Sequence, residues 1–305
     1  MEVSSLMSRV GVGGAGSGRG SSGFGKMIAA GLIVVVIGVA AALFIVNRKG
    51  GGDDGGGSVA GGGGVWNAGG EPMDSRSVAA RFEWADRKAD INGQMVYKPE
   101  PRIGKILSRT TRSYPSPTGV EASTARPEGV IFETIDMATM YPIPFSISDG
   151  PTAFEGNVPV GYSRSAAGAA LAAGAYNILT IQMNPDPQKA KTIIAGLDSG
   201  SVDAFRQFKE RDSADMSSKN ALSEEAFRSG YIMSPAGYKV AAYDGSYAKI
   251  LICTIFGPPS DWKGKNIGIG YVDLVWTDQG WKAQMYTEMI PEHDSLPEGL
   301  ISWTH

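Results

Sequence analysis

The carboxylates that could act as a general base lie near the end of the chain. Asp273 and Glu288 fall on two predicted strands, and each follows a tyrosine, Tyr271 or Tyr286, by two residues. Proton-transfer catalysis needs a base within reach of the substrate and a donor that stabilises the developing oxyanion. No histidine falls within these strands and no paired-acid spacing is present, so we favour carboxylates on the solvent face of a half-exposed sheet. We therefore expect no catalytic residue.

Other site chemistries have few residues to support them. The single cysteine, Cys253, allows no intrachain disulfide and no cysteine-rich zinc site, and we expect a small buried hydrophobe there. Of the two histidines, His293 is expected in a solvated tail and His305 lies beyond it. The glycine runs between positions 50 and 70 lack the Gly-Lys-Ser/Thr ending of a phosphate loop. The sequence predicts no metal site and no cofactor.

Composition sets the front of the chain apart from the rest. The chain has 305 residues, a formal net charge of −3 and an isoelectric point near 5.5. This balance argues against a nucleic-acid partner bound by phosphate attraction. Of the 42 glycines, 22 fall in the first 70 positions. The remainder has an ordinary glycine content and enough apolar residues to bury a core.

A membrane span is predicted at residues 27–46. This stretch has no charge, and at about 1.5 Å per residue a helix of this length crosses about 30 Å of hydrocarbon. A cleaved signal peptide is the alternative, although its apolar core is usually about 7–15 residues long. A short leader, one span and a long domain favour a cytoplasmic N-terminus and an extracytoplasmic C-terminal domain, with residues 1–26 a disordered cytoplasmic tail.

Two further segments are predicted before the folded domain. Residues 47–73 form a Gly-rich tether, whose flexible part reaches about 25–30 Å. Residues 74–129 form an extended arm of uncertain order. Residues 77–90 have the spacing of a short helix, and the prolines that follow exclude any long helix or strand. The arm packs on the domain or on a partner; a disordered spacer is the alternative.

An exported domain is predicted over residues 130–292, followed by a tail at 293–305. It begins with a strand near Val130, turns at Asp149-Gly150-Pro151 and continues with a helix, capped by Ser163 or Ser165, that runs through Gln182. Two more helices are expected, at Pro185–Leu197 and at Ser201–Arg228.

The last third of the domain has the pattern of a β-meander. At least one of Trp276 and Trp281, which flank the last turn, is expected in the core. Helices followed by antiparallel strands indicate an α+β fold with about three helices on one face of a curved sheet. The predicted strands are Tyr238–Tyr243, Tyr247–Phe256 (a central strand), Asn266–Thr277 and Trp281–Ile290. Hairpin turns are predicted at Asp244-Gly245 and at Thr277-Asp278-Gln279-Gly280.

Residues 130–290 resemble the nuclear transport factor 2-like cone fold. The likeness rests on an Ala/Gly helix after Gly161-Tyr162-Ser163 and on a meander that ends in a strand–turn–Trp pattern. Together with Pro144-Phe145-Ser146 and Asp149-Gly150-Pro151, these motifs are similar to those of single-span actinobacterial proteins, several of which are linked to conjugative or integrative elements. The layout also resembles the bitopic assembly protein of type IV secretion systems. That resemblance implies a non-catalytic exported scaffold that self-associates and binds other channel subunits.

Three functional hypotheses follow. The leading one is a non-enzymatic, single-pass cell-membrane protein whose exported domain is a protein–protein interaction scaffold, in a conjugative secretion apparatus. Its expected partners are the membrane, other envelope or secretion-channel proteins and a second copy of itself, but no nucleic acid. The second is an extracytoplasmic module that holds a lipid or small molecule in the cone's apolar mouth. The third is an isomerase-like enzyme that uses Asp273 or Glu288, since cone folds also host such enzymes.

Overall fold

A computed structural model describes residues 74–100, 102–135, 141–182, 187–197, 227–228, 232–255, 267–293 and 295–303. The predicted tail at 1–26, the span at 27–46 and the tether at 47–73 lie outside these residues, as does nearly all of the predicted helix Ser201–Arg228. Within the described ranges, no helix has both the length and the apolar character needed to cross a membrane.

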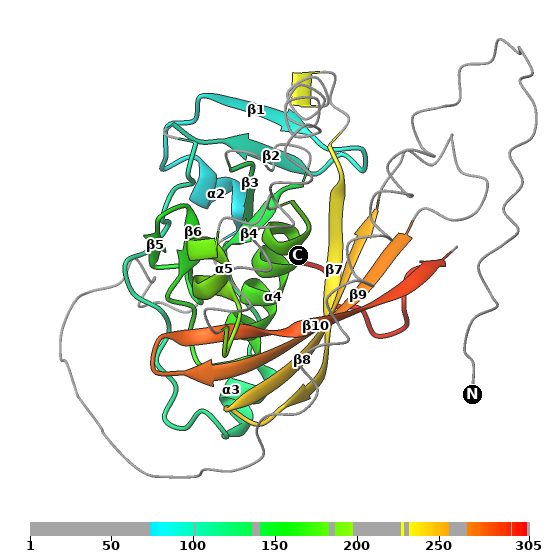
Figure 1. The fold of residues 1–305 in the computed structure, drawn as a ribbon. Coiled ribbons are helices and arrows are strands. Elements are labelled where there is room, and N and C mark those ends of the chain that lie inside the picture. Colours follow the sequence, from blue (N-terminus) through cyan, green and yellow to red (C-terminus); the bar gives the residue numbers. More distant parts are fainter. Residues whose placement is uncertain are drawn as a thin grey trace, which may run out of the picture. The chain divides into compact units, whose positions relative to one another are not determined.

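Two four-stranded sheets flank one long helix (Figure 1). The first sheet has the order β1-β2-β3-β4, with β2 and β3 parallel and the other pairs antiparallel. The second sheet is an antiparallel meander in the order β10-β9-β8-β7. The first sheet comprises β1 (Asp86–Ala89), β2 (Met95–Lys98), β3 (Ile131–Glu133) and β4 (Ile143–Phe145); the second comprises β7 (Ser234–Tyr243), β8 (Tyr247–Ile255), β9 (Ile267–Thr277) and β10 (Gly280–His293).

Four helices and a small hairpin complete the described structure, which has the predicted α+β class. The hairpin pairs β5 (Ala153–Glu155) with β6 (Val158–Val160). The helices are α2 (Ser75–Ala79), α3 (Val120–Thr124), α4 (Ala166–Gln182) and α5 (Pro187–Ile193).

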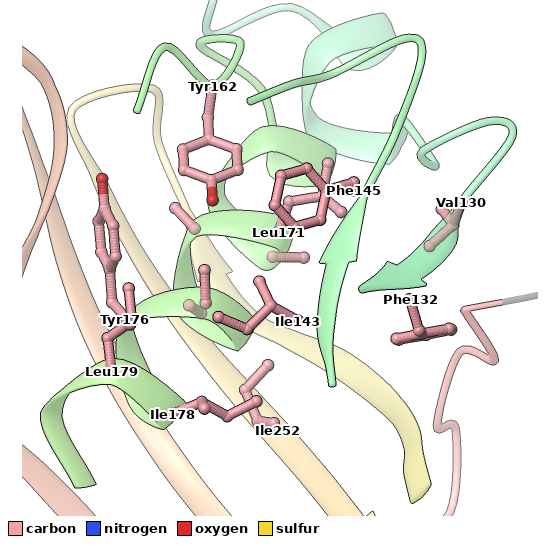
Figure 2. Packing of buried hydrophobic residues seen from close by; sticks show 14 of the residues in the cluster. Val130, Phe132, Ile143, Phe145, Tyr162, Leu171, Tyr176, Ile178, Leu179 and Ile252 are labelled. Atoms are coloured by element: carbon pink, nitrogen blue, oxygen red, sulfur yellow. The ribbon is translucent and has the colours of Figure 1, made fainter. Parts of the chain in front are cut away.

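Helix α4 is buried on every side. It packs against all four strands of the second sheet, and also against β4, β6 and α3. In Figure 2, α4 lies between β4, which carries Ile143 and Phe145, and the second sheet, which carries Ile252. A helix enclosed in this way needs no polar face, and its apolar residues can surround the axis. The predicted end of this helix at Gln182 is confirmed.

Small residues in α4 allow its neighbours to approach closely. A Cβ atom on Gly168 would lie 2.6 Å from Ser163 Oγ and 2.8 Å from Ser163 N, well inside van der Waals contact. A Cβ atom on Gly174 would lie 3.0 Å from Pro144 Cγ, which belongs to a side chain on β4. Glycine is favoured where another part of the chain comes this near.

The segment 74–129 shares the core of the domain. Val78 of α2 and Val96 of β2 are fully buried in the same apolar cluster as Phe132 and Ile143. The predicted helix across residues 77–90 is wrong after Ala79, because the chain turns there and then enters β1. Trp84 Nε1 donates a hydrogen bond to the Ala79 carbonyl at 2.9 Å, which satisfies a backbone acceptor at the helix end. Sequence spacing had placed the start of the domain at residue 130, whereas this core begins at residue 78.

The meander has the predicted strands and turns. The hairpin between β7 and β8 turns at Asp244 and Gly245, and the hairpin between β9 and β10 turns at Asp278 and Gln279. Asp244 Oδ1 accepts hydrogen bonds from the Ser246 and Tyr247 amides, so its side chain fixes the first turn.

The segment after β10 is packed rather than a solvated tail. Ile301 pairs with Tyr238 of β7 in an antiparallel bridge, and Trp303 is 3% exposed. His293 is the last residue of β10 and not part of a separate tail.

We expect Gly168→Ala to lower the free energy of unfolding by about 3 kcal/mol, because the new methyl group meets Ser163 backbone atoms that hold the helix start. Gly174→Ala is the matched control: it brings the same gain in helix propensity, about 1 kcal/mol, but its methyl group meets only side-chain rings, those of Pro144 and Trp303, and no backbone atom. Urea unfolding followed by circular dichroism measures both. Equal effects of the two substitutions would contradict the close packing at Gly168.

Candidate functional site

The predicted base, Asp273, lies on the face of the second sheet that points away from α4. Its neighbours in β9, Val272 and Leu274, are buried in the α4 cluster, and alternate residues of a strand face opposite sides. Asp273 Oδ1 accepts a hydrogen bond from the Tyr247 hydroxyl. On this outer face, Asp273 is half-buried and hydrogen-bonded.

Tyr271 does not serve Asp273 as a donor in this arrangement. Its ring lies under the Lys249 ammonium, with Nζ 4.7 Å from the ring centroid, a cation–π contact. Glu288 is paired with Tyr271 in the register of β10 and β9; the side chains of Glu288 and Tyr286 lie outside those described.

Electrostatics keep the Tyr247 phenol protonated. Burial, together with the hydrogen bond to Asp273 and the charge of that carboxylate, raises the pKa of Tyr247 to about 12. At neutral pH, the Tyr247 hydroxyl therefore keeps its proton and donates the hydrogen bond that Asp273 accepts. The pair can hold a strand contact or orient a polar group on the sheet surface.

The other singled-out residues serve packing. Cys253 is fully buried in β8, and burial raises the pKa of its thiol to about 12, as expected for a small hydrophobe. Trp281 is buried, which confirms that one tryptophan of the last hairpin belongs to the core. Its Nε1 donates a hydrogen bond to the Ser163 carbonyl at 2.9 Å, and its ring packs edge-on against Trp276, with centroids 5.2 Å apart.

A buried carboxylate in one of the predicted turns forms the most connected polar site among the residues that the structure describes. Asp149 is fully buried in the loop after β4. Asp149 Oδ1 accepts hydrogen bonds from Tyr114 Oη at 2.9 Å, Ser163 Oγ at 2.6 Å and Ser165 Oγ at 3.1 Å. Its other oxygen, Oδ2, accepts a hydrogen bond from Ser148 Oγ. These four hydroxyl donors replace the hydrogen bonds to water that the Asp149 carboxylate loses on burial.

The Asp149 cluster joins three parts of the chain. Tyr114 comes from the segment before α3, Ser148 from the loop of Asp149 itself, and Ser163 and Ser165 from the start of α4. Ser165 is also the helix cap, since its Oγ accepts a hydrogen bond from the Gly168 amide at 3.0 Å. The hydroxyls at 146, 148, 163 and 165 recur at two-residue spacing beside the motifs already noted, a signal that could have predicted their convergence.

A positive charge lies close to this cluster. Burial alone would lower the pKa of Arg112, but the attraction of Asp149 and then of Tyr114 and Glu128 outweighs it and raises the pKa above the usual range. Arg112 also forms an ion pair with Glu128. Burial, followed by the charge of Asp149, raises the pKa of Tyr114, so that hydroxyl remains a donor. Arg112 and Tyr114 therefore stabilise the buried carboxylate of Asp149 and the turn that carries it. Asp149 itself is fully buried and presents no reactive atom to solvent.

A second buried acid, Glu133, lies in the first sheet. Its Oε2 accepts a hydrogen bond from the Lys105 amide at 2.7 Å, while its Oε1 is buried with no hydrogen-bond partner. Burial raises the pKa of Glu133 well above its ordinary value of 4.5, and the hydrogen bond and charge of Lys105 offset only part of this. Such a perturbed acid is a candidate functional group by its chemistry, but it is enclosed by the core.

A polar groove of about 460 Å³ lies among β5, α5 and the turn into β10. Glu155, Lys191 and Lys282 supply its charges. Lys282 Nζ donates a hydrogen bond to the Lys191 carbonyl at 3.0 Å, which ties β10 to α5. Among the residues that the structure describes, no three His, Cys, Asp or Glu side chains converge as a metal site.

The comparisons with known proteins identify a family. A family model described as "Domain of unknown function (DUF8175)" matches residues 98–299, more than half of the chain, and the chain belongs to this family. No curated protein and no solved structure matches it. The matched region includes the Asp149 cluster, α4 and the whole meander.

Replacing Asp149 tests the role of the buried cluster. We expect Asp149→Ala to lower the free energy of unfolding by about 3–5 kcal/mol, because four hydroxyl groups lose a charged acceptor. Asp278→Ala, in the exposed turn between β9 and β10, is the control and should change it by less than about 0.5 kcal/mol. Chemical denaturation monitored by tryptophan fluorescence measures both, and similar values for the two variants would refute the role assigned to Asp149.

The raised pKa of Glu133 predicts a pH dependence of stability. The folded chain retains the Glu133 proton where the unfolded chain has lost it, so stability falls as pH rises above about 4.5. Glu133→Gln should therefore unfold at a higher temperature than the parent chain at pH 8 and at a similar temperature at pH 4. The exposed Glu121→Gln is the control, with no such pH-dependent difference. A Glu133→Gln profile parallel to that of the parent would rule out the effect.

Proposed function

We propose that the chain is a non-enzymatic, single-pass membrane protein whose exported domain is a protein–protein interaction scaffold. The observation that carries this proposal is the filling of the inner face of the second sheet by α4. A cone-fold enzyme holds its base on that inner face, whereas Asp273 lies on the outer face with Tyr247. A scaffold needs a rigid body and an accessible surface, and the doubly covered α4 supplies the rigidity.

The domain is proposed to be a variant of the nuclear transport factor 2-like cone. Long antiparallel strands and the helix across one face support this assignment, as do register shifts in the β7–β8 and β9–β10 pairs, because bulges bend a sheet. The first sheet, on the far side of α4, is an addition to that pattern. The same resemblance supports a role in a conjugative or type IV secretion apparatus.

The location of the domain follows from the segments before it. Residues 27–46 are apolar enough to span a bilayer, and the glycine-rich residues 47–73 allow the domain to stand off the membrane. The family match begins at residue 98, after both segments, which supports a domain separate from its anchor. We place the N-terminus in the cytoplasm and the domain outside, among envelope or secretion-channel proteins.

Among the described residues, no observation supports the ligand-binding alternative. A lipid-binding cone needs an apolar mouth, and the groove near α5 is lined instead by Glu155, Lys191 and Lys282. The scaffold proposal therefore has the stronger support.

In-cell cross-linking tests the anchor and the scaffold together. We expect the full chain to sediment with membranes and to cross-link to itself and to envelope proteins. Val35→Arg with Val36→Arg should move it to the soluble fraction and remove those cross-links, because each charge at the centre of a span costs about 2.5–3.5 kcal/mol.

The control places the same two charges in the tether, Val59→Arg with Val65→Arg, and should leave membrane binding unchanged. Parent chain in the soluble fraction would contradict the anchor. Membrane-bound chain that cross-links to no protein would contradict the scaffold.

A further inference from the structure

Positive charge is concentrated at the front of the domain. Residues 74–112 carry nine Lys and Arg against five Asp and Glu, a net charge of +4. Residues 113–305 carry 14 Lys and Arg against 22 Asp and Glu, a net charge of −8. An anionic surface therefore repels most of the domain, and the front segment is the part that such a surface attracts.

Three exposed arginines lie beside one another in this front segment. Arg76 belongs to α2, Arg81 to the turn that follows it and Arg87 to β1. Arg87 is opposite Tyr97 in the β1–β2 register, so the two side chains share one face of the sheet. Burial raises the pKa of Tyr97, and the charges of Arg87 and Arg76 oppose this shift, which places both cations near its hydroxyl. The helix α2 and the β1–β2 hairpin lie together in Figure 1.

Half-buried aromatic rings give the same surface an apolar part. The ring centroid of Trp84 lies 5.9 Å from that of Phe82 and 4.9 Å from that of Tyr97. The Lys105 ammonium lies 5.6 Å from the Trp84 centroid, in a cation–π contact. Met95, which is 41% exposed, precedes Tyr97 by two residues in β2 and so shares its face. The basic–aromatic patch, as we call this surface, comprises Arg76, Arg81, Phe82, Trp84, Arg87 and Met95.

The carboxylates nearby leave the arginines of the patch available. Asp74 Oδ1 accepts hydrogen bonds from two backbone amides at the start of α2. Asp86 Oδ1 accepts a hydrogen bond from the Arg87 amide. Within the described ranges, no carboxylate forms an ion pair with any of the three guanidinium groups. Glu83, which is exposed between Phe82 and Trp84, is the acid that most directly opposes an anionic ligand here.

The patch lies beside the point at which the tether joins the domain. The predicted tether at 47–73 leads directly to Asp74, which is the N-cap of α2. A flexible chain of this length spans about 25–30 Å, so the patch can meet the bilayer without the tether passing around the domain. Because the tether confines the domain near the bilayer, the lipid surface has a high effective concentration for the patch.

We propose that the basic–aromatic patch docks the domain on the anionic lipid surface of the membrane that holds its own span. Guanidinium groups form paired hydrogen bonds with phosphates, and tryptophan is enriched at the headgroup level of membranes. Anionic lipids attract basic residues that lie next to a membrane span. The inference rests on the proposed anchor and deepens it: the domain lies against the bilayer and turns its negatively charged remainder toward envelope proteins.

Cleavage of the tether separates docking from anchoring. The full chain, with a protease site inserted after Gly70, is reconstituted into vesicles of phosphatidylcholine alone or of an equimolar mixture with phosphatidylglycerol. After cleavage, the domain should still sediment with the anionic vesicles and not with the neutral ones. About 0.5 M NaCl should release it, because the Debye length there is about 4 Å.

Matched removals of charge test the assignment to the patch. The test variant replaces its three arginines: Arg76→Gln, Arg81→Gln and Arg87→Gln. The control variant removes three exposed charges from other parts of the domain: Arg126→Gln, Lys191→Gln and Lys239→Gln. The test variant should lower the partition coefficient of the cleaved domain at least tenfold, since each basic residue at an anionic surface contributes roughly fivefold. The control should change it less than twofold.

A change of opposite sign completes the test. Glu83→Gln removes the acid between the two aromatic residues and should raise the partition coefficient on anionic vesicles. Release of the cleaved domain from both kinds of vesicle, equal retention on both, or equal effects of the two triple variants would overturn the docking. In each of these cases, full chain that is vesicle-bound before cleavage still supports the anchor. Full chain that is not vesicle-bound before cleavage contradicts the anchor, and the docking with it.

Discussion

The burial of α4 on every side is the constraint on which the rest of the structure depends. A helix between two sheets can approach both only if its side chains are small, and Gly168 and Gly174 mark the closest contacts. Its start is fixed by Ser165, whose hydroxyl caps the helix and also reaches Asp149. The start of α4 and the hydrogen bonds to the buried Asp149 carboxylate therefore depend on the same serine. Both sheets pack on the helix that this arrangement fixes.

The sequence predicted the elements whose signals are local. The turns at Asp244-Gly245 and at Thr277–Gly280, and the alanine-rich helix through Gln182, depend on neighbouring residues and are found where expected. The first sheet has strands of three or four residues, and its central β2–β3 pair joins segments far apart in the chain. No periodicity can develop over such lengths, so its register could not be predicted. Trp303 was missed for a related reason: a single aromatic residue outside any periodic segment gives no sign of its partners.

The candidate site shows the same division between local and long-range information. The turn at Asp149-Gly150-Pro151 was predictable, but the burial of Asp149 depends on Tyr114 and Ser163, which are distant in the sequence. Asp273 was found as a candidate base, yet its hydrogen bond to Tyr247 depends on the pairing of β8 with β9. The local sequence around Asp149 and Asp273 thus gave no sign that the first would be enclosed and the second half-exposed. A rigid interior with its acids committed to structure is consistent with a scaffold whose contacts are made at its surface and edges.

Native-state hydrogen exchange of the full chain tests the central constraint most directly. The amides of residues 170–179, in the middle of α4, should exchange only through global unfolding and should be among the slowest in the domain. The amides of α5, which is covered on fewer sides, should exchange faster through local opening. Exchange of the middle of α4 at the rate of α5, or faster than the β8 amides beneath it, would show that the helix is not the enclosed centre of this fold.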